Sequence, residues 1–220
     1  MTWIVNICFH GIGVPQRTLE PGEDRYWISI EMFHRVLDEV IGRLDVRLSF
    51  DDGNASDIEI GLPALADRGL SASFFVIAGR LDLPGSLARH DLVELRRSGM
   101  LIGTHGMNHV PWRRLSEVAS NEEFVEARNL ISVSAGVAVD SAALPLGQYD
   151  RKVLQRLRRE GYRSVFTSDR RRANSEAWLQ PRYSLRADDT IDSFRRSVLD
   201  RPAILRELRA STVGLIKRLR

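Results

Sequence analysis

The sequence has few of the residues on which several common classes of protein depend. Cys8 is its only cysteine, so an intrachain disulfide and a cysteine-based zinc site are excluded. No apolar run is long enough to span a bilayer, and the N-terminus has no basic segment before an apolar stretch. These absences predict a cytoplasmic protein. Cys8 itself lies in the apolar run from Trp3 to Phe9, where we expect a buried strand residue rather than a nucleophile.

Lysine is nearly absent as well, because Lys152 and Lys217 are the only two among 32 basic residues. The formal net charge is +3, and no sequence-specific nucleic-acid motif is present, so we predict no nucleic-acid partner. The arginine-rich end of the chain, about residues 190–220, is predicted to form a basic helical tail. This tail could lie on a membrane surface, although covering the domain or mediating self-association is the favoured interpretation. The oligomeric state is left open.

Short apolar runs alternate along the chain with segments that carry apolar residues at helical spacing. The residues of Val46–Phe50, for example, alternate as in a strand, and Ser56–Arg68 follows with a helical pattern. This order predicts an α/β fold with a mostly parallel sheet and right-handed crossovers, either a (β/α) barrel or a doubly wound sheet. We expect residues 1–220 to form a single domain, since no linker or change in composition indicates a second one.

Two adjacent carboxylates, Asp51 and Asp52, end the strand-like run and precede Gly53. Gly53 permits a sharp exit with positive φ. Side chains of consecutive strand residues point apart, so the two aspartates could serve different roles at one site. An Asp-Asp-Gly sequence by itself is more often an ordinary turn, because aspartate bonds its own backbone and glycine supplies the unusual φ.

Two histidines follow the apolar run that ends at Thr104. His105 and His109 are four residues apart, a spacing that predicts a helical turn with both imidazoles on one face. Together with one carboxylate they would offer a divalent metal two nitrogens and one oxygen, which leaves open positions typical of a catalytic site. The second carboxylate would remain for proton transfer. Because these motifs follow strand ends, we place the site at the mouth of a barrel.

Two further residues have alternative interpretations. His10 ends the first predicted strand and could line the pocket or pack under a loop. Trp112 follows the second histidine and could form a wall of the site or belong to the core.

Three segments in this order resemble the motifs of the polysaccharide deacetylases, which share the NodB homology domain and form carbohydrate esterase family 4: Ser49–Gly53, Thr104–His109 and Leu144–Asp150. The resemblance spans about Ile4 to Arg182. It implies a distorted (β/α) barrel and the metal-dependent removal of N-acetyl groups from an amino sugar in a glycan or glycan precursor. An N-acetylated carbohydrate is therefore the expected partner.

The resemblance also implies roles for single residues. Asp51 would be the catalytic base, and Arg182 resembles the arginine that orients this base. Asp52, His105 and His109 would bind a divalent metal, with Zn²⁺ as the first choice and Co²⁺ or Mn²⁺ as alternatives.

The third motif would line the pocket for the acetyl group through Pro145, Leu146, Gly147 and Tyr149. It departs from the family pattern, because it lacks the usual arginine and has Leu146 where an aromatic residue is common. The chain also has no Leu-x-His near the C-terminal end of the barrel, where the family carries its general-acid histidine. Two alternatives follow: a deacetylase that uses His10 or water as the acid, or a protein that binds metal and sugar without turnover.

A third class, an aspartate-based phosphohydrolase, is disfavoured. Its carboxylates usually alternate along a loop to hold Mg²⁺, whereas Asp51 and Asp52 are adjacent and imidazoles prefer zinc-like metals.

Overall fold

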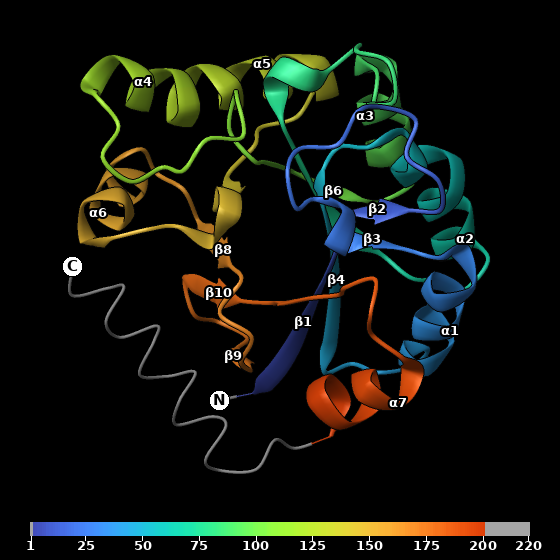
Figure 1. The fold of residues 1–220 in the computed structure, drawn as a ribbon. Coiled ribbons are helices and arrows are strands. Elements are labelled where there is room, and N and C mark those ends of the chain that lie inside the picture. Colours follow the sequence, from blue (N-terminus) through green and yellow to red (C-terminus); the bar gives the residue numbers. More distant parts are fainter. Residues whose placement is uncertain (1, 201–220) are drawn as a thin grey trace.

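A strongly curved, parallel sheet organises the fold in the computed structural model, which describes residues 2–200. The pairings along its main path are all parallel. In spatial order its strands are β10 (Leu179–Pro181), β8 (Ser164–Thr167), β7 (Ser141–Ala143), β6 (Leu101–Thr104), β5 (Ala72–Val76), β4 (Val46–Asp52), β1 (Trp3–Phe9) and β11 (Tyr183–Ser184) (Figure 1). Outside this path, β9 (Ala173–Asn174) pairs antiparallel with β1, and β2 (Gly11–Ile12) pairs with β3 (Trp27–Ile28).

The two ends of this sheet meet at Arg182. Strands β10 and β11 lie at opposite ends of the spatial order, yet Arg182 alone separates them in the sequence. Across the junction, the Asn6 amide on β1 donates hydrogen bonds of 3.0 Å to the Gln180 side chain and to the carbonyl of Pro181. The sheet is therefore a nearly closed barrel. This confirms the predicted barrel over the doubly wound alternative.

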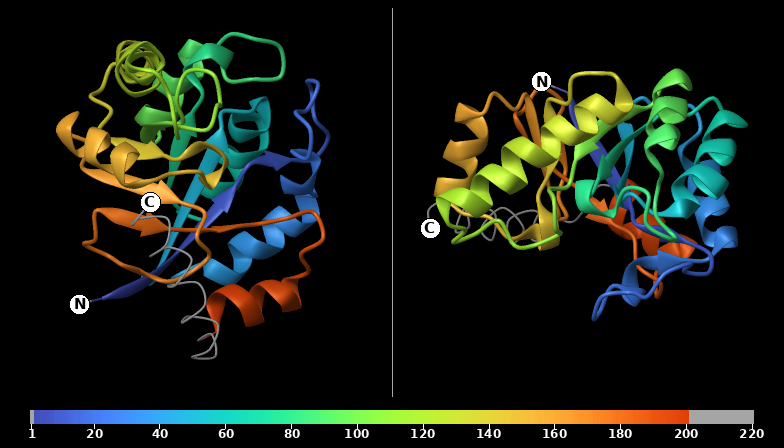
Figure 2. Two further views of the ribbon diagram at one scale, coloured as in Figure 1. Left: turned by 60° about the vertical axis from the view of Figure 1, so that its left-hand side comes forward. Right: turned by 90° about the horizontal axis from the view of Figure 1, so that it is seen from above.

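Helices surround the strands when the molecule is seen from above (Figure 2). They are α1 (Ile30–Val40), α2 (Leu62–Ala66), α3 (Arg89–Arg97), α4 (Glu117–Asn121), α5 (Ala127–Ala135), α6 (Arg151–Arg159) and α7 (Ile191–Phe194). Single π-helical turns precede α2 at Asp57–Gly61, join α4 to α5 at Glu122–Glu126 and extend α7 at Arg195–Leu199. Short 3₁₀ turns lie at Asp24–Tyr26, Ala78–Arg80 and Pro145–Gly147.

The predicted strands and helices correspond closely to these elements. Helix α1 begins where Ser29 accepts a hydrogen bond from the Met32 amide, and it buries its apolar stripe against the barrel. Within the predicted helical tail of about residues 190–220, residues 191–199 are helical. Residues 201–220 of that tail lie outside the described residues. Within residues 2–200, no helix is both long enough and apolar enough to cross a bilayer.

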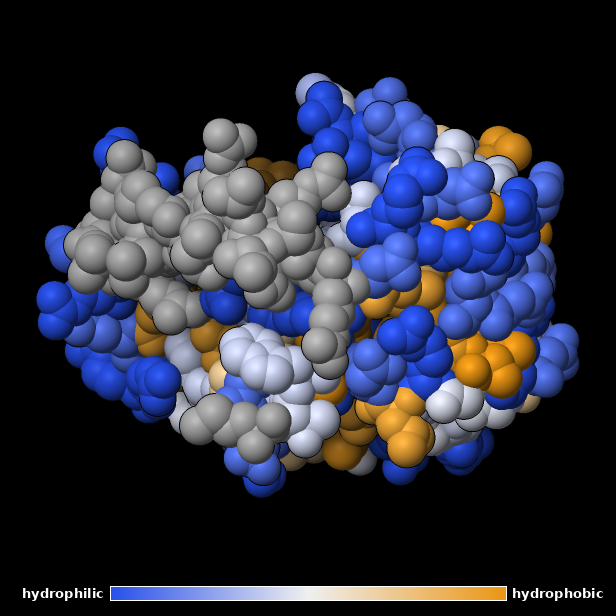
Figure 3. Space-filling view, turned by 90° about the horizontal axis from the view of Figure 1, so that it is seen from below, coloured by the Kyte–Doolittle hydropathy of each residue, from blue (hydrophilic) through white to orange (hydrophobic). Residues whose placement is uncertain are grey.

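A cluster of phenylalanine rings fills the interior beside α1. Phe50 stacks on Phe74 with ring centroids 4.6 Å apart, and Phe9 contacts both Phe33 and Phe50 at about the same distance. A second hydrophobic cluster surrounds Trp112 and lies against β7, β8 and α6. Seen from below, hydrophilic residues cover most of the visible coloured surface, with smaller hydrophobic patches among them (Figure 3). The buried aspartate and histidine side chains that could take part in a reaction lie at the carboxyl ends of the strands.

Candidate active site

A cavity of about 170 Å³ opens at the carboxyl ends of the barrel strands. This is the end at which the loops of a (β/α) barrel converge. The wall is built by residues that are far apart in the sequence: His10, Asp51, Asp52, His105, His109 and Arg182, together with Glu20, Pro21, Gly22, Glu23, Tyr26, Leu144, Leu146, Gly147, Ser168 and Ser184. The structure thus brings together all of the predicted metal and catalytic residues.

Asp52, His105 and His109 form a compact group of possible metal ligands. One carboxylate oxygen, Oδ1 of Asp52, lies 3.6 Å from Nε2 of His105 and 3.6 Å from Nε2 of His109. This oxygen is buried and has no hydrogen-bond partner among the described residues. A buried acceptor without a partner costs free energy, and a cation shared with the two imidazoles would remove that cost. The three side chains therefore fit a divalent metal.

The outer nitrogens of both imidazoles are hydrogen-bonded in a way that favours metal binding. Nδ1 of His105 lies 2.9 Å from the carbonyl oxygen of Ala143, and Nδ1 of His109 lies 2.7 Å from a carboxylate oxygen of Glu20. Because Nδ1–H donates in each case, the lone pair of Nε2 faces Asp52. Burial lowers the pKa of His105 to about 4, although Asp51 and Asp52 oppose this shift. His105 is therefore neutral at pH 7, as a metal ligand must be.

Glu20 was not predicted from the sequence. It lies in the irregular loop after β2, carries no motif, and is 89 positions from the histidine that it contacts. Arg80 binds its other carboxylate oxygen. No sequence signal identifies such a residue, because its role depends on how the loop folds over the barrel mouth.

The predicted helical turn through His105 and His109 is wrong. The segment is an irregular loop in which Gly106 has φ +84° and His109 has φ +54°, values outside the right-handed helical region. The two imidazole rings still lie close together, with centroids 5.3 Å apart. The imidazole rings of His105 and His109 are therefore neighbours in a loop rather than on a helical turn.

Glu123 stabilises this loop, which has no helical hydrogen bonds of its own. Its buried carboxylate accepts hydrogen bonds from the backbone amides of Met107 (2.9 Å) and Asn108 (3.0 Å) and from the indole of Trp112 (3.1 Å). It lies in the π-helical turn between α4 and α5, a type of irregularity that is frequent at functional sites. The apolar spacing of residues 116–131 predicts an ordinary helix there, so it does not single out Glu123.

Asp51, the other aspartate of the motif, pairs with an arginine. Both carboxylate oxygens of Asp51 accept hydrogen bonds of 2.6 Å from the Arg182 guanidinium, which also donates to the hydroxyl of Ser49 at 3.1 Å. Burial would raise the pKa of Asp51, but Arg182 and then His105 hold it well below its usual range. Asp51 is therefore an ionised carboxylate, oriented by a two-point contact.

The backbone is unusual at three places on the cavity wall. Asp52, His109 and Leu146 have φ values of +76°, +54° and +55°, in the left-handed region that non-glycine residues seldom adopt. Each such residue costs on the order of 1–3 kcal/mol and persists only where surrounding contacts impose it. Their concentration around one cavity is characteristic of a functional site.

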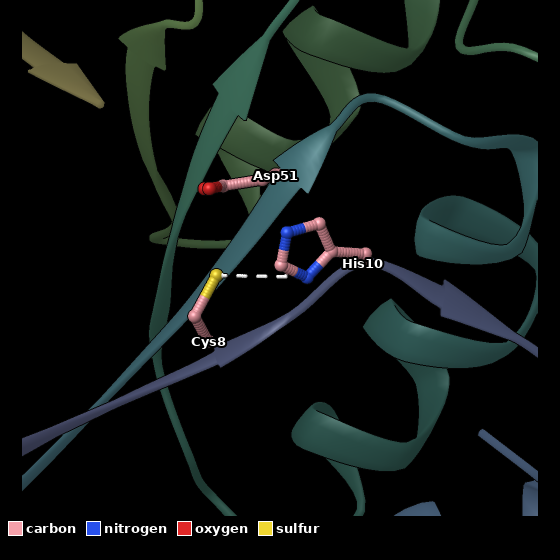
Figure 4. A group of neighbouring side chains, drawn as sticks. All are labelled: Cys8, His10 and Asp51. Atoms are coloured by element: carbon pink, nitrogen blue, oxygen red, sulfur yellow. Dashed lines mark hydrogen bonds between the residues drawn. The ribbon is translucent and has the colours of Figure 1, made fainter. Parts of the chain in front are cut away.

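Cys8, His10 and Asp51 form a neighbouring group (Figure 4). His10 also lies on the cavity wall. The His10 ring stacks on Tyr26, and its Nδ1 lies 4.0 Å from the Cys8 sulfur. Although this group is compact enough for a metal, both oxygens of Asp51 are bound to Arg182. Burial raises the pKa of the Cys8 thiol well above its usual value, so the thiol is neutral in the metal-free protein. Asp52 and its histidines are the better candidate.

The third motif lies only partly in the cavity. Leu146 and Gly147 line it, as predicted, whereas Trp112, Pro145 and Tyr149 are buried outside its wall. Of the two alternatives for Trp112, the structure supports the core position. The Tyr149 hydroxyl is directed to Asp169, to which it donates a 2.6 Å hydrogen bond. Packing of this tyrosine into the second hydrophobic cluster explains why it does not reach the cavity.

Metal content tests the proposed ligand group directly. We expect His105→Ala and His109→Ala each to lower bound zinc at least about tenfold, because each removes one of three protein ligands. The measurement is elemental analysis after dialysis against limiting metal. His90→Ala is the matched control, since His90 is exposed on α3 and outside the cavity. Wild-type metal content in both cavity variants would refute the ligand assignment.

The fold and this group together define an α/β barrel with a candidate metal centre at the carboxyl ends of its strands. The sequence profile described as polysaccharide deacetylase matches residues 42–165, which is more than half of the chain. The chain therefore belongs to the polysaccharide deacetylase family, also known by its NodB homology domain and as carbohydrate esterase family 4. This confirms the resemblance seen in the motifs.

Individual relatives are distant. YxkH of Bacillus subtilis (strain 168), whose name assigns it to the polysaccharide deacetylases, is 22% identical over 124 residues, 56% of this chain and 44% of the relative. The chain thus matches less than half of that protein. Among solved structures, Streptococcus pyogenes deacetylase PplD, in complex with acetate, has a TM-score of 0.75 at 18% identity, covering 91% of this chain and 99% of PplD. BA0330 of Bacillus anthracis has a TM-score of 0.77 at 17% identity, and the match covers 90% of this chain and 69% of BA0330.

Proposed function

We propose that this protein is a metal-dependent deacetylase that hydrolyses N-acetyl groups on an amino sugar of a glycan or glycan precursor. One observation carries the proposal: a single cavity holds an ionised carboxylate, Asp51, beside the metal-ligand group of Asp52, His105 and His109. Membership of the deacetylase family supports it. The acetate bound to PplD, a deacetylase with the same fold, is the product that such a reaction would release.

Asp52, His105 and His109 would hold the divalent metal. Two imidazoles and one carboxylate suit Zn²⁺ best, and Co²⁺ or Mn²⁺ would also be accepted. When bound, such an ion polarises a carbonyl oxygen and lowers the pKa of a coordinated water. Exposed Leu146 on the cavity wall offers an apolar contact for the acetyl methyl group.

Asp51 would be the general base. Its carboxylate is already ionised, and each oxygen bound to Arg182 has a further lone pair that can accept a proton from water. Arg182 cannot act as the acid, because a guanidinium does not lose its proton in proteins. Its role would be to orient Asp51 and keep it charged between turnovers.

His10 would supply the proton that the departing amine needs. It lines the same cavity, and one of its ring nitrogens lies within 4.8 Å of an Asp51 oxygen. The remaining histidines of the wall, His105 and His109, are assigned to the metal. His10 therefore replaces the histidine that the family pattern places near the C-terminal end of the barrel, which favours turnover over the binding-only alternative.

The test is acetate release from N-acetylated monosaccharides and oligosaccharides by protein loaded separately with Zn²⁺, Co²⁺ or Mn²⁺. We expect release that stops when a chelator removes the metal. Protein that holds metal and binds an acetylated sugar, yet releases no acetate with any of the three ions, would contradict the proposal and identify a binding protein.

The same assay tests His10. We expect His10→Gln to lower acetate release from the N-acetyl sugar by about 10²–10⁴-fold, the range for loss of a general acid. The loss should be far smaller with p-nitrophenyl acetate, whose leaving group needs no proton. Equal losses on both substrates would show that His10 has a structural role only.

A further inference from the structure

A second and larger cavity, of about 810 Å³, lies between α4, α6 and the loop that connects β6 to α4. Helices α4 and α6 are neighbours on one side of the barrel (Figure 1). Two acidic residues line this cavity, Glu117 and Asp150, against five basic ones: Arg113, Arg114, Lys152, Arg156 and Arg159. The formal charge of its wall is therefore +3. Neither the family assignment nor the proposed reaction explains this concentration of positive charge.

Only part of this charge is neutralised. Arg156 forms ion pairs with Glu117 (2.8 Å) and Glu160 (2.6 Å). The Nε atom of Arg113 lies 3.9 Å from a carboxylate oxygen of Asp150, beyond hydrogen-bond distance, and has no hydrogen-bond partner within residues 2–200.

Arg114, Lys152 and Arg159, which are all exposed, form no ion pair with the part of the chain that the structure describes. Like charges around a concave surface raise the local potential and attract anions. The cavity is thus suited to a negatively charged ligand.

The basic cavity adjoins the candidate active site. Trp112 follows the ligand His109 by three positions, and Asp150 follows Gly147 of the active-site wall by three positions. Three residues of extended chain span at most about 11 Å between Cα atoms. The segments 109–112 and 147–150 follow the neighbouring strands β6 and β7 at their carboxyl ends. One ligand could therefore occupy both cavities.

Two buried aromatic side chains of the second hydrophobic cluster lie beneath the basic cavity. Trp112 and Phe124 contact each other edge to face, with ring centroids 4.8 Å apart. A rim of guanidinium and ammonium groups suits the oxygens of phosphate or carboxylate. A volume of about 810 Å³ is more than a bare ion needs. The size of the cavity and its basic rim together fit a charged group attached to a sugar.

We propose that this cavity binds an anionic group, phosphate or carboxylate, carried by the same acetylated carbohydrate whose N-acetyl group enters the active site. The identity of the carbohydrate rests on the proposed deacetylase function; the anion selectivity rests on the charges of the second cavity. The substrate class is accordingly an anionic glycan or a phosphorylated glycan precursor rather than a neutral polymer.

Binding of charged and neutral carbohydrates to the whole 220-residue chain tests this inference without requiring turnover. The probes are N-acetylglucosamine oligosaccharides of one to three sugars, each neutral, with a reducing-end phosphate, or with that end oxidised to a carboxylate. By calorimetry we expect at least one charged probe to bind about tenfold more tightly than its neutral counterpart, with the advantage declining as salt increases. The phosphate and carboxylate series identify which anion is preferred.

The matched variants are Arg114→Asn with Lys152→Gln and Arg159→Gln, against Arg151→Gln as control. Asparagine tolerates the left-handed backbone of Arg114 (φ +61°), and Arg151 is exposed on α6 outside the cavity lining. We expect the triple variant to lose the preference for charged probes and the control to keep it. Three results would overturn the inference: no preference in the wild type, a preference that survives the triple substitution, or inorganic phosphate binding as tightly as the phosphorylated sugar.

This experiment separates the two proposals. Anion selectivity without acetate release would leave the subsite intact and refute the deacetylase function. Acetate release without anion selectivity would support the deacetylase function and refute the anionic subsite.

Discussion

Replacement of Asp51 by Asn is expected to lower acetate release by about 10²–10⁴-fold, the contribution of a positioned general base. The amide is nearly the same size but cannot take a proton from water. Bound metal should stay close to the wild-type amount, because Asp52, His105 and His109 are unchanged. The measurement is acetate release alongside elemental analysis of the same preparation.

Ser49→Ala is the matched control for Asp51→Asn. It removes the other side-chain acceptor of Arg182 while leaving the carboxylate in place. We expect a much smaller loss of activity than with Asp51→Asn. Unchanged acetate release in a correctly folded Asp51→Asn protein would rule out Asp51 as the base.

Arg182→Met is expected to have the largest effect on stability. Asp51 would remain buried with no partner for its charge, and breaking a buried ion pair in this way typically costs about 3–5 kcal/mol. The free energy of unfolding, measured with urea, should fall by that order at pH 7. In the double variant Asp51→Asn/Arg182→Met the stranded charge is absent, so much of the loss should be recovered.

The loss of unfolding free energy in Arg182→Met should also depend on pH. In the wild type the pKa of Asp51 is lowered, so the pair contributes stability above the unfolded-state pKa, and this is lost as acid protonates the folded carboxyl. In Arg182→Met, burial without the arginine raises the pKa of Asp51, so the folded state binds more protons and stability falls as pH rises. The difference between the two proteins should therefore shrink toward pH 4. A difference that is small, or equal at pH 4 and pH 7, would show that the ion pair matters little.

The site shows clearly what local sequence can indicate. Asp51, Asp52 and the two histidines follow strand-like runs, and strand ends converge in a parallel barrel, so their meeting could be predicted. The helical turn through His105 was wrong because a spacing of four residues is compatible with both a helix and a loop. Glu123, which is distant in the sequence, decides between them by binding two amides of the loop.

The sequence by itself determined the alternation of strands and helices, the deacetylase motifs and the candidate metal ligands, because these depend on local periodicity and short spacing. The resemblance implied different roles for the two aspartates, but only the tertiary structure shows the contacts: Asp51 pairs with Arg182, 131 positions away, and Asp52 faces the two histidines. The tertiary structure also placed Glu20 behind His109 and gathered unpaired cations beside the site. Closure of the barrel creates these contacts, and no local pattern encodes which distant side chains a closed sheet brings together.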